Sequence, residues 1–234
     1  FNKIPKASAR LKPNALPRPI SWSLEKVLQL ASSIDNDSAL LKDLTQKSIF
    51  LTAMASGARI SEIVALSRDE NHIRFLDSGE VELYPVSSFL AKNELPTDRW
   101  GPWKIIPLDI EPSLCPVRCL KAYLSKSKTF GGGQLFRGET TGSNLTPTQL
   151  RSKLVYFIKR ADPDSIPKGH DPRKVAASLH FCQNMSFDSI KSYTGWKSSG
   201  VFYKHYLKQL NEVKHYVVAA GSVIRPTAPG LPPS

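Results

Sequence analysis

The sequence has little cysteine and no long apolar run. Three cysteines in 234 residues are too few, and odd in number, for a disulfide framework, which favours a reducing compartment. No apolar stretch approaches the roughly 20 residues that span a bilayer, and the N-terminus lacks the apolar core of a signal peptide. The composition therefore predicts a soluble, intracellular protein.

Acidic residues are scarce relative to basic ones. Lys and Arg total 32 against 20 Asp and Glu, which gives a formal net charge of +12 at pH 7. Such an excess suits nucleic acid or another anionic partner. Basic proteins without such partners also exist, so the charge alone does not decide the function.

Residues that would hold a cofactor are equally sparse. Cys115 and Cys119 fall short of the four ligands of a zinc site, and packing at the start of a helix is the favoured interpretation. The run from Gly131 to Gly133 lacks the Lys-Ser/Thr of a phosphate-binding P-loop. We therefore expect neither a metal nor a nucleotide cofactor.

Composition divides the chain into three parts. Residues 1–20 carry five basic residues, four prolines and no acid, which predicts an extended basic linker that follows DNA, or else a solvated arm. Residues 21–212 have the periodic apolar pattern of one folded domain. Residues 213–234 hold an apolar segment and a Pro-rich tail.

Hydrophobic periodicity predicts a mostly helical α+β domain. Strand patterns at 73–75, 81–83 and 104–108 predict a small antiparallel three-stranded sheet. Ser23 and Thr146 are predicted helix N-caps, and Gly57 should end the second helix. The predicted helices cover 24–34, 40–54, 61–66, 116–124, 147–158, 170–181, 186–195 and 201–210.

A phosphate-binding helix end is predicted at His170 and Arg173. The two residues are three apart, with Pro172 between them, so both side chains should share one face of a helix N-terminus. Free backbone N–H groups and the positive end of the helix dipole favour an anion there.

Arg59 lies in the predicted joint between the helix that Gly57 ends and the next helix. Held there beside Glu62, Arg59 is placed to point into a cleft. An Arg near a Glu is more often an exposed ion pair of small energetic worth, and this motif alone favours that interpretation.

Other side chains also suit phosphate chemistry. Lys92, in the segment between the second and third strands, could swing over a bound phosphate, although a loop lysine is usually only solvated. Tyr203 and Tyr206 are neighbours on one helical face, and each is either a nucleophile or a core aromatic. The helix from 147 carries four basic residues suited to DNA or to a soluble surface: Arg151, Lys153, Lys159 and Arg160.

In this order, the motifs resemble those of tyrosine recombinases over about residues 20–212. They are GARISEIVALS around Arg59, Lys92 in a β-hairpin region, the H-x-x-R of His170 and Arg173, TGW ending at Trp196, and a terminal Tyr. The run HDPRKVAAS followed by GW-x(5)-F-x(3)-Y is similar to the pattern in DIRS-like and Crypton-like eukaryotic mobile elements. The resemblance implies site-specific DNA recombination or integration by a transposable-element enzyme, located in the nucleus.

The resemblance also implies roles for the site residues. Tyr206 would attack a phosphorus of double-stranded DNA and form a 3′-phosphotyrosine, while Arg59 and Arg173 would bind the non-bridging oxygens. Tyr206 fits the F-x(3)-Y spacing, but Tyr203 on the same face is the alternative nucleophile. No metal or nucleotide is needed, because the phosphotyrosine conserves the bond energy.

The resemblance also implies two residues that transfer protons and one that donates a hydrogen bond to the phosphate. Lys92 would be the general acid for the 5′ oxygen, and His170 would assist proton transfer at the tyrosine. Trp196, where many relatives carry a second His, can donate one hydrogen bond but cannot shuttle a proton.

Relatives also differ from this chain or extend beyond it. Many have Arg-His where this chain has Arg173-Lys174. They usually carry an N-terminal domain that closes around DNA and a C-terminal segment that docks on a neighbouring protomer. We expect residues 1–20 to be only a linker and the N-terminal domain to be absent from this sequence. The resemblance thus implies a dimer or tetramer on DNA. Two other functions stay open, a type IB topoisomerase and a domesticated DNA-binding module that does not cleave.

Overall fold

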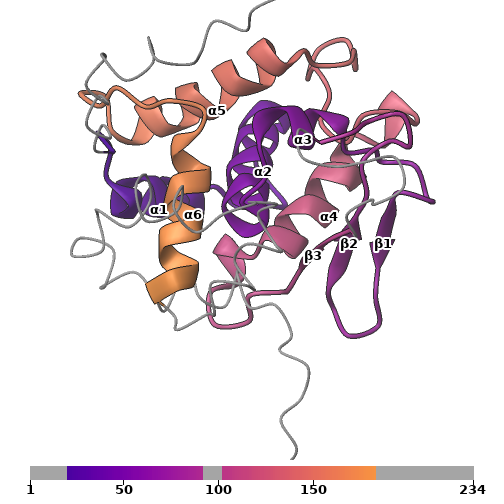
Figure 1. Cartoon of the computed structure of the whole chain (residues 1–234), viewed down its shortest axis with the longest axis horizontal. Helices are drawn as coiled ribbons and strands as arrows, with labels where there is room; N and C mark the ends of the chain where they lie inside the picture. Colours follow the sequence, from indigo (N-terminus) through magenta and orange to yellow (C-terminus); the bar gives the residue numbers. More distant parts are fainter. Residues whose placement is uncertain (1–19, 92–101, 183–234) are drawn as a thin grey trace, which may run out of the picture.

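The computed structural model describes residues 20–91 and 102–182 (Figure 1). In this part of the chain, α-helices predominate and a single small sheet of three antiparallel strands accompanies them, which confirms the predicted fold class. The helices are α1 (Leu24–Ser33), α2 (Leu41–Ser56), α3 (Ile60–Ala65), α4 (Pro116–Lys126), α5 (Pro147–Ala161) and α6 (Asp171–Cys182). The strands are β1 (Ile73–Phe75), β2 (Val81–Leu83) and β3 (Trp103–Ile105), and two 3-10 turns, Pro112–Leu114 and Lys128–Phe130, flank α4.

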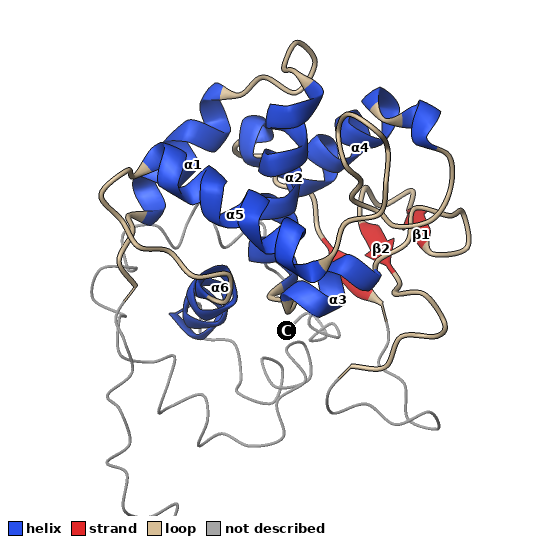
Figure 2. Cartoon of the chain, turned by 90° about the horizontal axis from the view of Figure 1, so that it is seen from above, coloured by secondary structure: helices blue, strands red, loops and turns tan. Residues whose placement is uncertain are grey.

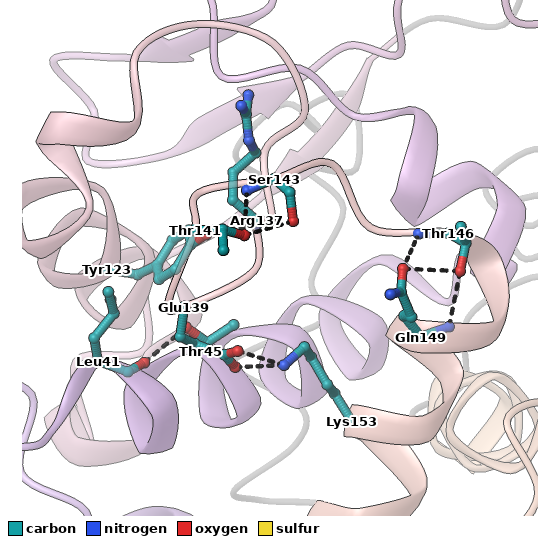
Figure 3. A network of polar contacts seen from close by, with 10 residues as sticks. All are labelled: Leu41, Thr45, Tyr123, Arg137, Glu139, Thr141, Ser143, Thr146, Gln149 and Lys153. Carbon is teal, nitrogen blue, oxygen red and sulfur yellow. Dashed lines mark hydrogen bonds and ion pairs between the residues drawn. The ribbon is translucent and has the colours of Figure 1, made fainter.

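Local signals in the sequence set the helix ends. The Ser23 hydroxyl accepts a hydrogen bond from the Lys26 N–H at 3.3 Å, as expected of the N-cap of α1. Thr146 and Gln149 form a reciprocal capping box at α5 (Figure 3). Gly57 ends α2 in the left-handed conformation, with φ 55°. All three predictions are confirmed.

Helix α2 is the centre of the core, and α4, α5 and α6 pack against it (Figure 1). Every α2 residue from Leu44 to Ser56 is buried. The Phe50 ring lies edge-on to Trp22 at 6.5 Å and contacts Phe157 of α5 at 5.5 Å between ring centroids. Each such buried aromatic contributes roughly 1.5–3 kcal/mol, so this cluster fixes α5 against α2.

Lys47 is the unexpected member of this core. Its side chain is 0% exposed, and its Nζ donates a hydrogen bond to the Ile34 carbonyl oxygen at 2.6 Å. That carbonyl belongs to the C-cap of α1, where a cation complements the helix dipole. Burial lowers the pKa of Lys47, because removal from water disfavours the charged form.

The sheet has the order β1-β2-β3, with Phe75 opposite Val81 and Leu83 opposite Trp103. Val81 and Leu83 face the core, so β2 anchors the sheet. The third strand begins one residue earlier than predicted and ends at Ile105, not at 108. Pro107 accounts for the early end, because it has no N–H to continue the ladder.

Cys115 and Cys119 lie in the core at 0% exposure, as the packing interpretation predicts. The Cys115 sulfur accepts the Leu108 N–H at 3.3 Å. Burial raises the pKa of the Cys119 thiol to about 11. Within 20–91 and 102–182, no group of three or more His, Cys, Asp or Glu side chains is placed to hold a metal ion. No helix in these ranges has the length and apolarity to cross a membrane.

Candidate active site

The joint between α2 and α3 holds Arg59 in place. Arg59 is the N-cap residue of α3, and its backbone N–H donates to Oε2 of Glu62 at 2.6 Å. Its side-chain Nη1 contacts Oε1 of the same carboxylate. Glu62 therefore caps the helix and orients the guanidinium at the same time.

The ion pair between Arg59 and Glu62 is largely buried. The side chain of Arg59 is 22% exposed and that of Glu62 is 2% exposed. The interpretation of this motif as an exposed surface pair is therefore wrong. The sequence could not show the contacts made here by distant segments, since α3 packs against α5 and Arg173 of α6 lies near the Glu62 carboxylate.

Helix α6 brings Arg173 to the same carboxylate. Its Nη1 donates a hydrogen bond to the Gly57 carbonyl oxygen at 2.5 Å and lies 3.7 Å from Oε2 of Glu62. Arg173 is 5% exposed. The packing of α6 on α2 makes this contact possible, and Figure 2 shows α6 nearly end-on. The structure thus brings the two predicted arginines together through Glu62.

Glu62 and the Gly57 carbonyl are the site components that sequence reasoning did not assign. The three-residue spacing of Arg59 and Glu62 indicated an ion pair, but it gave no sign that Arg173 would join it. Two guanidinium groups thus lie around one carboxylate. Guanidinium groups are planar, bidentate donors, which suits them to an anionic ligand such as a phosphate.

His170 differs from its predicted placement. Helix α6 begins at Asp171, so His170 precedes the helix, and its carbonyl accepts the Lys174 N–H at 3.3 Å. His170 is exposed, whereas Arg173 is buried, so the two side chains do not share one environment. A turn explains the late start, because the Asp171 carboxylate accepts the Lys168 N–H at 2.7 Å.

The other predicted site residues lie outside the described residues. They are Lys92, Trp196, Tyr206 and the alternative nucleophile Tyr203. The structure places only the neighbour of Lys92, namely Ala91, which is 5% exposed and lies in the connection between β2 and β3. Residues 1–19 of the predicted linker, the helices at 186–195 and 201–210, and the C-terminal segment lie outside as well, whereas Ile20 is described and packs against the core.

Two of the four basic residues that the sequence places on α5 contact acidic side chains. Lys153 donates to the Glu139 carboxylate at 2.7 Å (Figure 3), and Arg160 contacts Asp43 of α2. Two of the four basic residues that were predicted to suit DNA or a soluble surface are therefore paired with acids. Arg151 and Lys159 are exposed and form no ion pair within the described part of the chain.

Comparison with solved structures identifies the fold. The chain is similar to the crystal structure of XerA recombinase, with a TM-score of 0.59 and 15% identity, over 88% of this chain and 65% of that one. A lambda integrase dimer bound to a COC′ core site matches with a TM-score of 0.49 and 18% identity, over 88% of this chain and 51% of that one. No family model matches the sequence, and no curated protein does.

The helices and the small sheet are thus arranged as in a recombinase of known structure. The chain spans less than two thirds of the length of either protein. At 15% identity the likeness defines the fold, and the activity has to be argued from the site.

Proposed function

We propose that this chain is the catalytic part of a tyrosine recombinase that cleaves and rejoins double-stranded DNA. The observation that carries the proposal is the pair Arg59 and Arg173, held by one buried carboxylate, Glu62. The XerA-like fold and the net charge of +12 support it independently.

In the proposed reaction the two arginines stabilise charge on the non-bridging oxygens of the scissile phosphate. The Tyr206 oxygen attacks phosphorus, the bond from phosphorus to the 5′ oxygen breaks, and a 3′-phosphotyrosine forms. Arginines that act on a transferring phosphoryl group contribute roughly 10³- to 10⁵-fold in rate. Loss of Arg59 or Arg173 should therefore nearly abolish cleavage.

Proton transfer falls to Lys92 and His170. The Lys92 ammonium would give its proton to the departing 5′ oxygen, and His170 would assist removal of the tyrosine proton, since free tyrosine has a pKa of about 10. The exposed position of His170 at the start of α6 is compatible with this role. Trp196 would donate one hydrogen bond to the phosphate.

The natural setting is part of the proposal. The HDPRKVAAS and GW-x(5)-F-x(3)-Y motifs support a mobile-element recombinase, which would work in the nucleus as a dimer or tetramer on DNA. The net positive charge supplies sequence-independent affinity for the phosphate backbone.

A covalent-trapping experiment tests this function. The chain is incubated at low salt, in EDTA, with a pool of short duplexes that carry random central sequences and a nick in one strand. Covalent protein–DNA adducts are then detected by denaturing electrophoresis. We expect an adduct with the wild type and with Tyr203→Phe, and none with Tyr206→Phe.

Other outcomes separate the alternatives. An adduct lost only in Tyr203→Phe moves the nucleophile to that residue. No adduct with a wild type that binds DNA refutes the proposal in favour of a non-cleaving module. Relaxation of supercoiled plasmid by the monomer would indicate a type IB topoisomerase.

A further inference from the structure

Arg151 of α5 lies directly against the backbone that leads into α6. A Cβ atom at residue 169 would be 2.5 Å from Cγ and 2.9 Å from Cδ of Arg151. Gly169 does not have a positive φ. Glycine at position 169 therefore leaves space for the arginine stem, and the backbone conformation there does not itself require glycine.

The charge of Arg151 is not compensated. Lys153 and Arg160 on the same helix each contact a carboxylate, but Arg151 has no such partner within the described residues. A surface arginine would normally be held by an acid or move freely. Here the stem lies against Gly169, and the residue as a whole is exposed.

The surroundings of Arg151 at the start of α6 are basic. His170 follows Gly169 directly and is exposed, and Lys168 before it is exposed as well. The acid of this turn, Asp171, is 5% exposed and is already engaged by the Lys168 N–H and by Lys174 Nζ at 3.6 Å. An anion here would meet exposed positive groups and a buried, engaged carboxylate.

We propose that Arg151 is a positioning residue that binds a DNA backbone phosphate beside the scissile one, with Gly169 leaving room for its stem. This inference rests on the proposed function for the identity of the ligand. Arg151 lies against Gly169, which directly precedes His170. A phosphate bound to Arg151 would therefore fix the start of α6, and with it Arg173, relative to the DNA strand.

The test is the salt dependence of DNA binding, measured by fluorescence anisotropy with a 30-base-pair duplex of random sequence. Each lost phosphate contact lowers the slope of log K against log salt by about 0.9. We expect this loss in Arg151→Ala and a slope near wild type in Arg151→Lys, which keeps the charge. Lys159→Ala is the matched control, because Lys159 is exposed, lies about 12 Å further along α5 and forms no ion pair with the residues that the structure describes. Its slope should stay at the wild-type value.

Gly169→Ala tests the geometry. It should lower the slope as Arg151→Ala does, because the new methyl displaces the arginine stem. In the Arg151→Ala background it should change neither slope nor stability, since the remaining Arg151 Cβ lies an ordinary 3.6 Å from the new Cβ.

Three results overturn the inference: an unchanged slope in Arg151→Ala, an equal loss in Lys159→Ala, or a wild type that does not bind DNA. A wild type that binds with the expected slopes but forms no covalent adduct refutes only the recombinase proposal. The two failures are thus distinguishable.

Discussion

Oε2 of Glu62 lies 3.7 Å from Nη1 of Arg173, while Oε1 of the same carboxylate contacts Arg59. A single buried acid thus joins two arginines that come from distant parts of the chain. Both cations are therefore held without a ligand, Arg59 by the carboxylate and Arg173 by the Gly57 carbonyl oxygen beside it.

Removing the charge of Glu62 should destabilise the fold. Glu62→Gln removes the carboxylate charge that Arg59 and Arg173 share, and breaking a buried pair costs about 3–5 kcal/mol. Urea unfolding followed by tryptophan fluorescence measures the loss. Asp109→Asn is the control, because its pair with Arg118 is exposed and should contribute no more than about 1 kcal/mol. Equal losses of unfolding free energy in Glu62→Gln and Asp109→Asn would contradict a buried ion pair at Glu62.

Gly57→Ala should also destabilise the protein, by about 1–2 kcal/mol, because residue 57 has φ 55° and a side chain is strained there. Gly57→Asn should lose less, since asparagine tolerates the left-handed conformation. Thermal unfolding of the two variants compares them directly. Identical melting temperatures for wild type and Gly57→Ala would exclude this strain.

Acid should weaken the attachment of α1 to α5. The hydrogen bond from Lys26, at 2.7 Å, holds the pKa of Asp162 below its usual value, and the Ser23 N–H adds to the effect. A carboxylate whose pKa is lower in the folded than in the unfolded state stabilises the fold at pH values above its unfolded-state pKa, which is about 3.9 for Asp. This stabilisation is lost as the pH falls through the folded-state pKa. The stability difference between wild type and Asp162→Asn should be constant from pH 5 to 8 and shrink below about pH 4.

The pH experiment has a neighbouring control. Asp164→Asn changes an exposed acid in the same loop and should alter stability little across this pH range. If the stability difference between wild type and Asp162→Asn instead grows as pH falls, the pKa of Asp162 is not lowered in the folded state, and the prediction is wrong.

The core thiols should be inert in the folded protein. Both Cys115 and Cys119 are 0% exposed, and burial raises the Cys119 pKa to about 11, so its thiolate is scarce at pH 8. In a Cys182→Ser variant we expect no fast reaction with a chromogenic disulfide reagent until denaturant unfolds the chain, when two thiols react. Fast labelling of the native variant would show that this part of the core opens.

Features set by adjacent residues could be predicted from the sequence. Ser23, Thr146 and Gly57 act within one helical turn, so their roles follow from residue type and spacing. The residues of the candidate site were selected by a resemblance of motifs. Periodicity alone would have left Arg59 as a surface residue.

Contacts between distant segments could not be predicted. The link of Glu62 to Arg173 depends on how α6 packs on α2. The ion pair of Lys153 could not be predicted for the same reason, because its partner Glu139 belongs to a separate loop. Periodicity indicates which face of a helix is polar, but it does not indicate which charges meet.

The bridge through Glu62 also imposes an order on folding during synthesis. Arg59 and Glu62 are translated well before Arg173, so the carboxylate is complete long before its second cation exists. While the later segments emerge, Arg59 alone neutralises Glu62. When α6 docks, Arg173 is buried beside a carboxylate that is already in place, so the last helix of the described part completes the candidate site.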